Sequence, residues 1–147
     1  MSQRVEALAL KGRNFKARWL TKFEGKLTLQ DRRTAAMDKS LRDSYEAYQE
    51  AFYQDLNQYL WGLAALQMGM ILLELAEGNE DGWKQMFDDD EEPDTYRKRL
   101  VRSIEALREI VPASVSSALS QMASLVPERA YAEITRAKIC FLLCDSV

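Results

Sequence analysis

The segment from Ser44 to Glu77 runs for 34 residues without a proline, and apolar residues recur through it at helical spacing. The clearest stripe begins just before this segment and consists of Leu41, Tyr45, Tyr48, Phe52 and Leu56. Intervals of three and four residues place these side chains on one face of a helix, opposite a charged face. The pattern therefore predicts long amphipathic helices, and no part of the chain has the alternation of a β-strand.

The second part of that segment, from about Gln58 to Ala76, is apolar on nearly every side of a helix. Only Gln67 and Glu74, seven residues apart, mark a thin polar stripe. Such a helix lies either at the centre of a bundle or in a membrane. Because the apolar run of about 17 residues is shorter than the roughly 20 that a span requires, we predict a central helix and no membrane segment.

Glycine and proline separate the remaining apolar patterns in the first half of the chain. Gly25 is expected to end a first helix over residues 2–23. A second helix is expected to begin near Thr28 and to continue to a turn at 56–58. One unbroken helix through both patterns would be about 70 Å long, too long for a compact domain of this size, so we expect the turn.

The second half begins with an acidic connection at about 78–93, expected to hold at most one turn near Trp83–Phe87. Asp94 can cap a helix that we expect to stop at Pro112. A shorter helix over residues 115–125 is expected to follow, and Pro127 to open the last one. These elements predict an all-α fold of six or seven antiparallel helices.

Length and composition fit one globular domain covering residues 1–147. Hydrophobic residues make up 47% of the chain and charged residues 29%, which is typical of a folded protein. The net charge is −3, but residues 1–42 carry +7, residues 43–96 carry −13 and residues 97–147 carry +3. In a compact domain the basic first third can face the acidic middle, or it can attract acidic partners.

Residues that carry chemistry are scarce. The chain has no histidine and no glycine-rich phosphate loop, so we expect no enzyme activity, no cofactor and no metal. The acidic run over residues 88–92 lacks the register of a calcium-binding loop and is expected to be solvated.

Cys140 and Cys144 lie four apart and are expected to be reduced, buried thiols. The first residues contain no apolar signal segment, which predicts a cytoplasmic protein.

Basic residues alternate with aromatic ones near the start of the chain, at Lys11, Arg13, Phe15, Lys16, Arg18, Trp19 and Lys22. A nucleic-acid surface would use such a set. However, Phe15 and Trp19 are four apart and are expected to face the core, and the chain is acidic overall. We therefore expect no nucleic acid, and we take Arg13, Lys16, Arg18 and Trp19 as candidate contacts for a partner protein or an anion.

Two motifs resemble a known family. The first is Gly12-Arg13-Asn14-Phe15-Lys16 followed by Arg18-Trp19, and the second places Ser44, Tyr45, Tyr48, Ala51, Phe52, Asp55, Leu56, Tyr59, Gly62 and Leu63 at fixed spacings. They are similar to the tetratricopeptide-like TRAFs-binding domain of apoptosis signal-regulating kinases and bacterial multidomain proteins. The closing "ERAYAEITRAKICFLL" also resembles the last helix of that region. Ala64 stands where the family has asparagine.

The resemblance implies stacked, tetratricopeptide-like helical hairpins in which Gly12, Tyr48, Phe52, Asp55, Tyr59 and Gly62 are structural. It also implies a non-catalytic interaction or regulatory scaffold that binds a protein partner or a neighbouring effector domain. Two alternatives stay open. One is a homodimer formed through the apolar last helix, and the other is a small-molecule or anion sensor with a pocket near Trp19, Tyr59 and Trp61.

Overall fold

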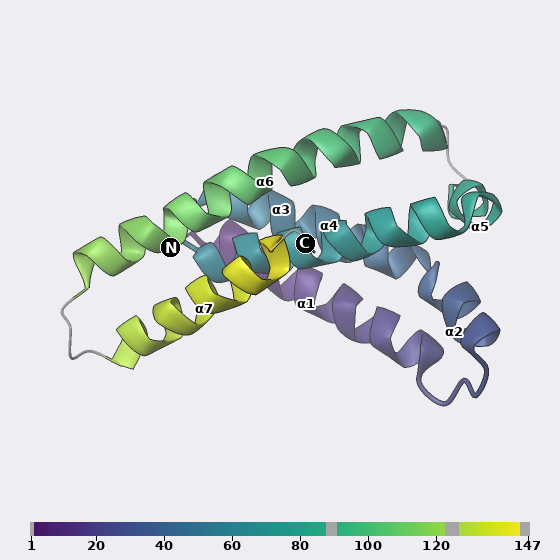
Figure 1. The fold of residues 1–147 in the computed structure, drawn as a ribbon, viewed down its shortest axis with the longest axis horizontal. Coiled ribbons are helices and arrows are strands. Elements are labelled where there is room, and N and C mark those ends of the chain that lie inside the picture. The colour runs from purple at the N-terminus through teal and green to yellow at the C-terminus, as the bar shows by residue number, and fades with distance from the viewer. Residues whose placement is uncertain (1, 88–90, 123–126, 145–147) are drawn as a thin grey trace.

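The computed structural model describes residues 2–87, 91–122 and 127–144. These residues form seven α-helices and no strand (Figure 1), which confirms the all-α prediction. The helices are α1 (Gln3–Phe23), α2 (Leu29–Ala36), α3 (Lys39–Gln54), α4 (Tyr59–Gly78), α5 (Glu80–Gln85), α6 (Pro93–Gln121) and α7 (Pro127–Leu143).

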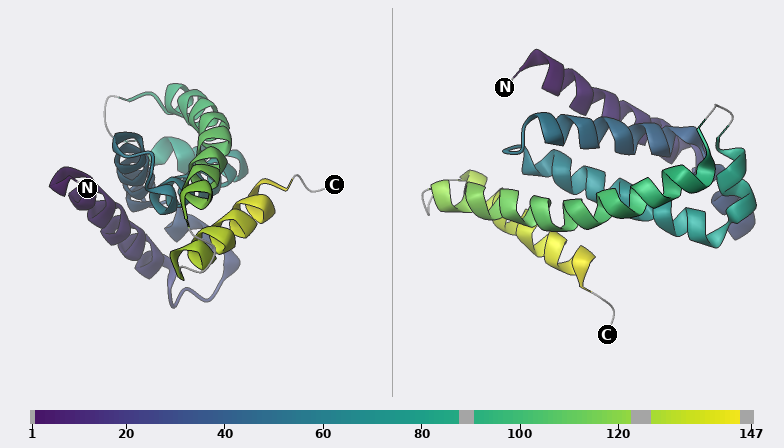
Figure 2. Two further views of the ribbon diagram at one scale, coloured as in Figure 1. Left: turned by 90° about the vertical axis from the view of Figure 1, so that its left-hand side faces the viewer. Right: turned by 90° about the horizontal axis from the view of Figure 1, so that it is seen from above.

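The long helices pack in the order α1, α3, α4, α6, α7. Viewed from above, α1 and α7 form the two outermost layers, with α3, α4 and α6 between them (Figure 2, right). The short helix α2 packs on α1, and α5 packs on the end of α4. Helix α4 also contacts α7, so it has neighbours on several sides, as expected for the most apolar helix of the chain.

Three aromatic rings of α3 pack directly against glycines of the two neighbouring helices. The pairs are Gly12 of α1 with Tyr48, Gly62 of α4 with Phe52, and Gly69 of α4 with Tyr45. A Cβ atom added at Gly62 would lie 2.9 Å from the Phe52 ring, and one at Gly12 would lie 3.0 Å from the Tyr48 ring. The helices can therefore approach closely only because these positions lack side chains.

The predicted helix over residues 28–56 is divided in two. Its start at Thr28 is confirmed, because the Thr28 hydroxyl accepts a hydrogen bond from the Asp31 amide. At Asp38, however, a new helix begins, and the Asp38 carboxylate accepts hydrogen bonds from the Ser40 amide and hydroxyl. An aspartate that caps a helix N-terminus in this way favours a fresh start over a continuous helix.

The predicted turn at 56–58 is confirmed, since α3 ends at Gln54 and α4 begins at Tyr59. Asp55 organises it, because its carboxylate accepts hydrogen bonds from the Asn57 amide at 3.1 Å and the Gln58 side-chain amide at 3.4 Å. Short polar side chains stabilise turns by such local bonds. Leu56, by contrast, was predicted to continue the core stripe and is exposed.

The predicted stop at Pro112 is wrong, because α6 continues through this residue to Gln121. A proline inside a helix removes a backbone hydrogen bond and crowds an earlier carbonyl, at a cost of about 3 kcal/mol. Val111 and Val115, on either side of it, are completely buried. Burial of apolar side chains thus outweighs the local cost of the proline. The shorter helix predicted over 115–125 is the end of α6. Residues 123–125 lie outside the described part of the chain.

The acidic connection contains more structure than expected. Helix α5 starts at Glu80, before the predicted turn at Trp83–Phe87. Trp83 is buried, and its indole N–H donates to the Pro93 carbonyl at 3.1 Å. Its ring packs against Phe87 and Tyr96, with centroids 4.9 and 5.9 Å away. Of the acidic run, residues 88–90 lie outside the described residues.

The cysteines are not where they were predicted. Both Cys140 and Cys144 are exposed free thiols on the last turn and the end of α7. The buried residues of α7 are Ala132, Thr135 and Ile139. Cys140 and Cys144, four residues apart, therefore lie together on the solvent-facing side of α7.

Candidate partner-binding trough

Helix α4 is only partly covered by its neighbours. Among the described residues it is the one helix long and apolar enough to cross a membrane, and 44% of its most apolar window is buried. Its fully buried residues include Ala65, Leu66, Leu72 and Ala76, which belong to the main core. A helix that is apolar on all sides and half covered leaves an apolar face open.

The open face is a stripe of four residues, Leu60, Ala64, Ile71 and Leu75. Their spacing of four, seven and four residues places them on one side of the helix. Leu60 is 54% exposed, and the other three are partly buried and also pack against the main core. Partly exposed apolar residues that follow one another along one side of a helix can form a binding surface.

A hollow of about 370 Å³ lies at the start of this stripe, between α1 and α4. Leu60, Trp61 and Ala64 line it from α4, and Leu10 and Arg13 line it from α1. Leu10 is itself 47% exposed. The hollow is therefore walled mainly by apolar and aromatic side chains, and the Arg13 guanidinium and the Glu6 carboxylate also line it.

A second hollow of about 300 Å³ lies at the other end of α4, next to α2. Arg33, Met37, Glu74 and Leu75 line it. We call the stripe and its two hollows the α4 trough. From Leu60 to Leu75 the stripe extends along α4 for roughly 22 Å, which is about four helical turns, and one hollow lies at each end of it.

Charges of both signs stand at the two ends of the α4 trough. Glu6 and Arg13 line the first hollow, and Arg33 and Glu74 line the second. Tyr48 forms part of the first wall, and burial raises the pKa of its phenol, while the Arg13 guanidinium acts in the opposite direction. The phenol therefore stays neutral at ordinary pH. The surface offers apolar contact along its length and polar contacts at its ends.

Of the four candidate contact residues, the structure places one in the α4 trough. Arg13 lines it, and Lys16 is half-buried elsewhere on α1. Arg18 lies over the Phe15 ring, 5.5 Å from its centroid. Trp19 is a core residue, and its indole N–H donates to the Ala36 carbonyl at 2.9 Å. Its role is thus to tie α1 to the end of α2.

The sensor pocket expected near Trp19, Tyr59 and Trp61 is only partly assembled. Trp61 and Arg13 line the same hollow. Tyr59 packs against the main core, and Trp19 is on the far half of α1. The indole and the guanidinium come together, while the other two aromatic residues serve the core.

Much of the basic charge of α1 faces the acidic side of α3. Arg4 pairs with Glu50 at 3.5 Å, and Lys22 pairs with Asp38 at 3.8 Å. Lys11 shares a hollow of about 230 Å³ with Asp43, Glu46 and Glu50. These contacts favour the interpretation that the charge asymmetry of the sequence is balanced largely within the fold.

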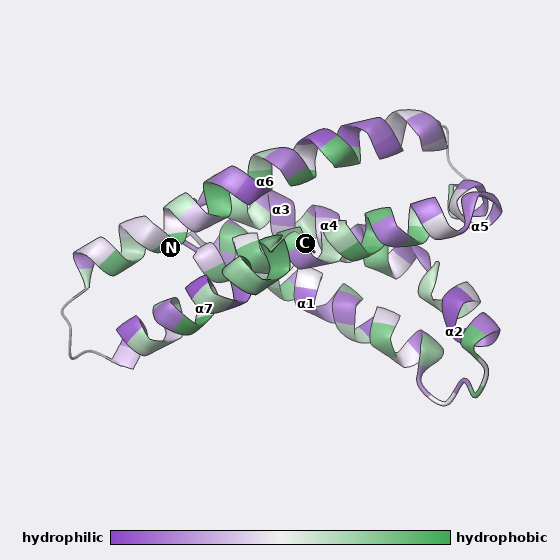
Figure 3. Cartoon of the chain, in the orientation of Figure 1, coloured by the Kyte–Doolittle hydropathy of each residue, from purple (hydrophilic) through white to green (hydrophobic). Residues whose placement is uncertain are grey.

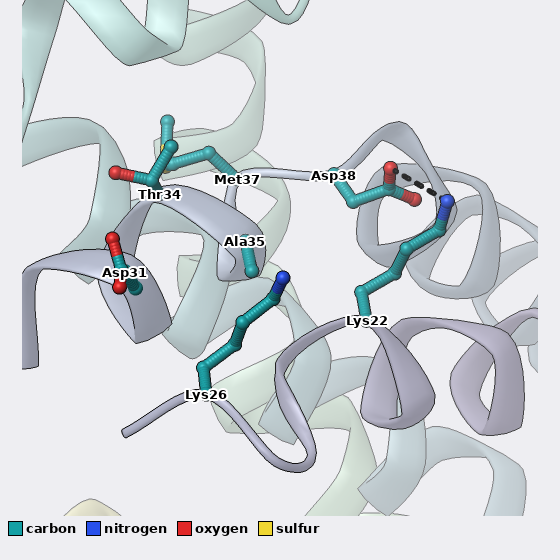
Figure 4. Close-up of a pocket in the computed structure, with 7 residues that line it drawn as sticks. All are labelled: Lys22, Lys26, Asp31, Thr34, Ala35, Met37 and Asp38. Carbon is teal, nitrogen blue, oxygen red and sulfur yellow. Dashed lines mark ion pairs between the residues drawn. The ribbon is translucent and has the colours of Figure 1, made fainter. Parts of the chain in front are cut away.

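A further hollow of about 420 Å³ lies between the end of α1 and α2 (Figure 4). Lys22 and Lys26 line it together with Asp31 and Asp38. Burial raises the pKa of Asp38, but the hydrogen bonds from Ser40 and the Lys22 ammonium outweigh this and lower it overall. Because two carboxylates offset two ammonium groups, this hollow has no excess charge with which to hold an anion.

No cluster of three or more His, Cys, Asp or Glu side chains suited to a metal occurs among the described residues. Comparison with known proteins gave no family model, no curated protein and no solved structure that matches the chain. The interpretation of this site therefore depends on its own geometry.

The trough-lining residues Leu60, Ile71 and Leu75 were interpreted from the sequence as parts of an all-round apolar helix. One feature of the sequence corresponds to the open side of α4, namely the position of its two polar residues. Gln67 and Glu74 form the thin polar stripe of that helix, and in the structure Glu74 is exposed and Gln67 half-buried beside the open face. The position of polar residues in an apolar helix thus indicated which side is uncovered.

Proposed function

We propose that this chain is a non-catalytic protein-interaction module that binds an amphipathic helix of a partner protein in the α4 trough. The observation that carries the proposal is the open apolar stripe along α4, flanked by a hollow at each end. An amphipathic helix buries its apolar face in such a groove through residues at intervals of three and four.

The dimensions and charges support a helix rather than a small ligand. A length of roughly 22 Å matches about four turns of a partner helix. The opposite charges at each end, Arg13 with Glu6 and Arg33 with Glu74, suit a partner whose ends carry polar side chains of both signs. The hollows are open to solvent and lined by mixed polar and apolar groups, unlike the enclosed pocket that a small molecule needs.

The proposal extends to the arrangement of the helices, the location of the protein and its role. We propose that the helices form tetratricopeptide-like antiparallel hairpins related to the TRAFs-binding domain. We also propose that the module is cytoplasmic and serves as a scaffold or restraint for an effector. The packing of α3 between α1 and α4 through glycine-aromatic pairs at motif positions Gly12, Tyr48, Phe52 and Gly62 supports this relation.

The test is site-specific photo-crosslinking in cells of the source organism. A photoreactive phenylalanine analogue at Leu60 or Leu10 is expected to capture the same discrete protein. The analogue at Leu27, which is 95% exposed and lines neither hollow of the α4 trough, is the matched control. Capture of the same set of proteins from all three positions would contradict a specific site.

A surface variant makes the same test without the crosslinker. Leu60→Arg places a charge in the lining of the first hollow, and we expect it to abolish binding to the captured partner. Leu27→Arg makes the same chemical change outside the trough and should bind normally. Equal binding by both variants would exclude the α4 trough as the binding site.

A further inference from the structure

Helix α7 has one face that the fold covers. Ala132, Thr135 and Ile139 are buried, and α7 packs on α6 and α4. The Arg129 guanidinium fixes the start of the helix, since it donates to the Leu119 and Met122 carbonyls at 2.8 and 3.3 Å. This face holds the helix in place.

The opposite face of α7 is also apolar, although nothing in the described chain covers it. It consists of Ala130, Ile134, Ala137, Phe141 and Cys144, all of them exposed. Ile134 is 53% exposed and Phe141 is 86% exposed. We call these five residues the outer stripe, and the later part of α7 is coloured as hydrophobic in Figure 3.

The outer stripe has the spacing of a coiled-coil seam. Its members follow one another at intervals of four, three, four and three residues. In a heptad, Ile134 and Phe141 then occupy a positions, while Ala130, Ala137 and Cys144 occupy d positions. Ile134 provides the β-branched side chain that two-stranded pairing favours at a positions, while the d positions hold alanine and cysteine in place of the usual leucine.

Charges on the two flanks of the outer stripe complement those of a second copy. Glu133 stands at a g position and Lys138 at an e position, five residues later. In a parallel two-stranded pair, the g residue of one chain meets the e residue of the next heptad in the other. Two-fold symmetry therefore makes the Glu133–Lys138 contact twice. Within its own helix Glu133 also pairs with Arg136 at 2.6 Å and with Arg129 at 3.5 Å.

We infer that the outer stripe of α7 binds the outer stripe of a second copy of this chain, as a parallel two-stranded coiled coil. The occupant of the stripe is therefore the chain itself, in a self-complementary two-fold interface. Two heptads alone are too short for stable association of isolated helices. Here α7 is already ordered by α6 and α4, so pairing does not need to order the helix.

The surface area that the outer stripe can bury limits the affinity of the dimer. Two heptads bury less than the roughly 1,600 Å² of a standard interface, so we expect a dissociation constant on the order of micromolar. Multi-angle light scattering over a concentration series on the reduced protein should then show a mass that rises to twice 16.9 kDa. A mass of 16.9 kDa up to several hundred micromolar would overturn the inference.

Phe141→Glu is the variant that tests the stripe itself. Because the Phe141 ring is 86% exposed in the single chain, the variant should fold with an unchanged circular dichroism spectrum. It should remain at the monomer mass at concentrations where the unaltered chain is a dimer. Leu27→Glu, the same kind of change on another exposed residue, should leave the dimer intact. A dimer that survives Phe141→Glu would place the interface elsewhere.

The orientation is tested at Cys144, since equivalent d positions face each other in a parallel pair. Disulfides form between Cα atoms less than about 7 Å apart. Diamide, which accepts the two electrons and two protons of the thiols, should therefore produce a covalent dimer. Cys144→Ser should abolish this product, and Cys140→Ser should not. A dimer that cross-links through Cys140 alone, or not at all, would overturn the parallel pairing.

Discussion

Helices α3 and α7 are both amphipathic, yet they differ in how completely neighbouring helices cover them. Helix α3 lies between α1 and α4, and its rings are pressed against glycines on both sides. Helix α7 is an outermost layer (Figure 2). One of its apolar faces is buried where it packs on α6 and α4, and the other lies in solvent. The same residue types therefore stabilise the domain in α3 and remain available for association in α7.

The apolar residues that hold the fold together and those for which we propose a binding role are arranged differently around their helices. In α3 the apolar residues form a single stripe, and charged residues occupy the other side. In α7 and α4 apolar residues occur around most of the helix, which is more than neighbouring helices can cover. Surplus apolar surface on a helix is the common property of the α4 trough and the outer stripe.

Removal of one aromatic ring from α3 and one from α7 should give the largest difference in stability between the two helices. Phe52→Ala deletes a completely buried ring of α3 and should lower the free energy of unfolding by about 3–5 kcal/mol. Phe141→Ala deletes an exposed ring of α7 and should change it by less than about 0.5 kcal/mol. Urea unfolding at a concentration where the chain is monomeric measures both. Similar losses from the two variants would mean that α7 is covered within the chain.

The glycine contacts of α3 provide the next test. Gly62→Ala puts a methyl group 2.9 Å from the Phe52 ring, and the overpacking should cost about 1–3 kcal/mol of unfolding free energy. Gly78→Ala, in the same helix, meets no atom within 4 Å and should be neutral or stabilising by up to about 1 kcal/mol. Urea midpoints that move in the same direction for both variants would contradict the close packing of α3 on α4.

Alkaline pH should weaken the α3 contacts through Tyr45. Burial raises the pKa of Tyr45 to about 12 from its ordinary value of 10.0. The folded state keeps the proton that the unfolded state loses, so stability is complete below pH 10 and falls as the pH rises toward 12. The loss should reach about 2 kcal/mol.

The pH test uses two tyrosine variants. Tyr45→Phe should make the decline in urea stability between pH 10 and 12 shallower, and the remaining decline is expected from Tyr96, whose pKa is also raised by burial. Tyr131→Phe, on the exposed part of α7, should leave it as it is. An identical pH dependence in the two variants would show that Tyr45 is not the residue responsible.

The smallest expected effect concerns the start of α3. Asp38→Ala removes the N-cap acceptor and should destabilise the domain by about 0.5–2 kcal/mol. Asp38→Asn keeps an acceptor and should cost only a few tenths of a kcal/mol, because asparagine is an equally good cap. Thermal unfolding separates the two variants, and equal losses would show that charge rather than capping matters at this position.

The sequence predicted the parts of the fold that depend on periodicity. The first and last helices and the turn around Asn57 are confirmed. The break at Asp38 was missed because apolar spacing continues across it, while the capping bonds that start α3 involve only two residues. The continuation of α6 through Pro112 depends on burial of Val111 and Val115, which local sequence cannot show.

The candidate site was predicted less well than the fold. Arg13 was selected for its charge and does line the α4 trough, but Trp19 was selected beside it and lies in the core. Periodicity shows that a residue is apolar on a given face and does not show whether a neighbour covers that face. The exposure of Leu60, Phe141 and both cysteines follows from how many helices pack around α4 and α7, which is a property of the whole chain.

The most direct test of an open α4 trough is solvent paramagnetic relaxation of methyl groups by NMR, on the monomeric Phe141→Glu variant with a neutral gadolinium chelate. We predict strong broadening of the Leu10 and Leu60 methyl signals, since both side chains are about half exposed. The methyl signals of Leu66 and Leu72, which are completely buried, should be unaffected. If Leu10 and Leu60 were as protected as Leu66, the chain would close the trough itself, and a site for a partner helix would be excluded.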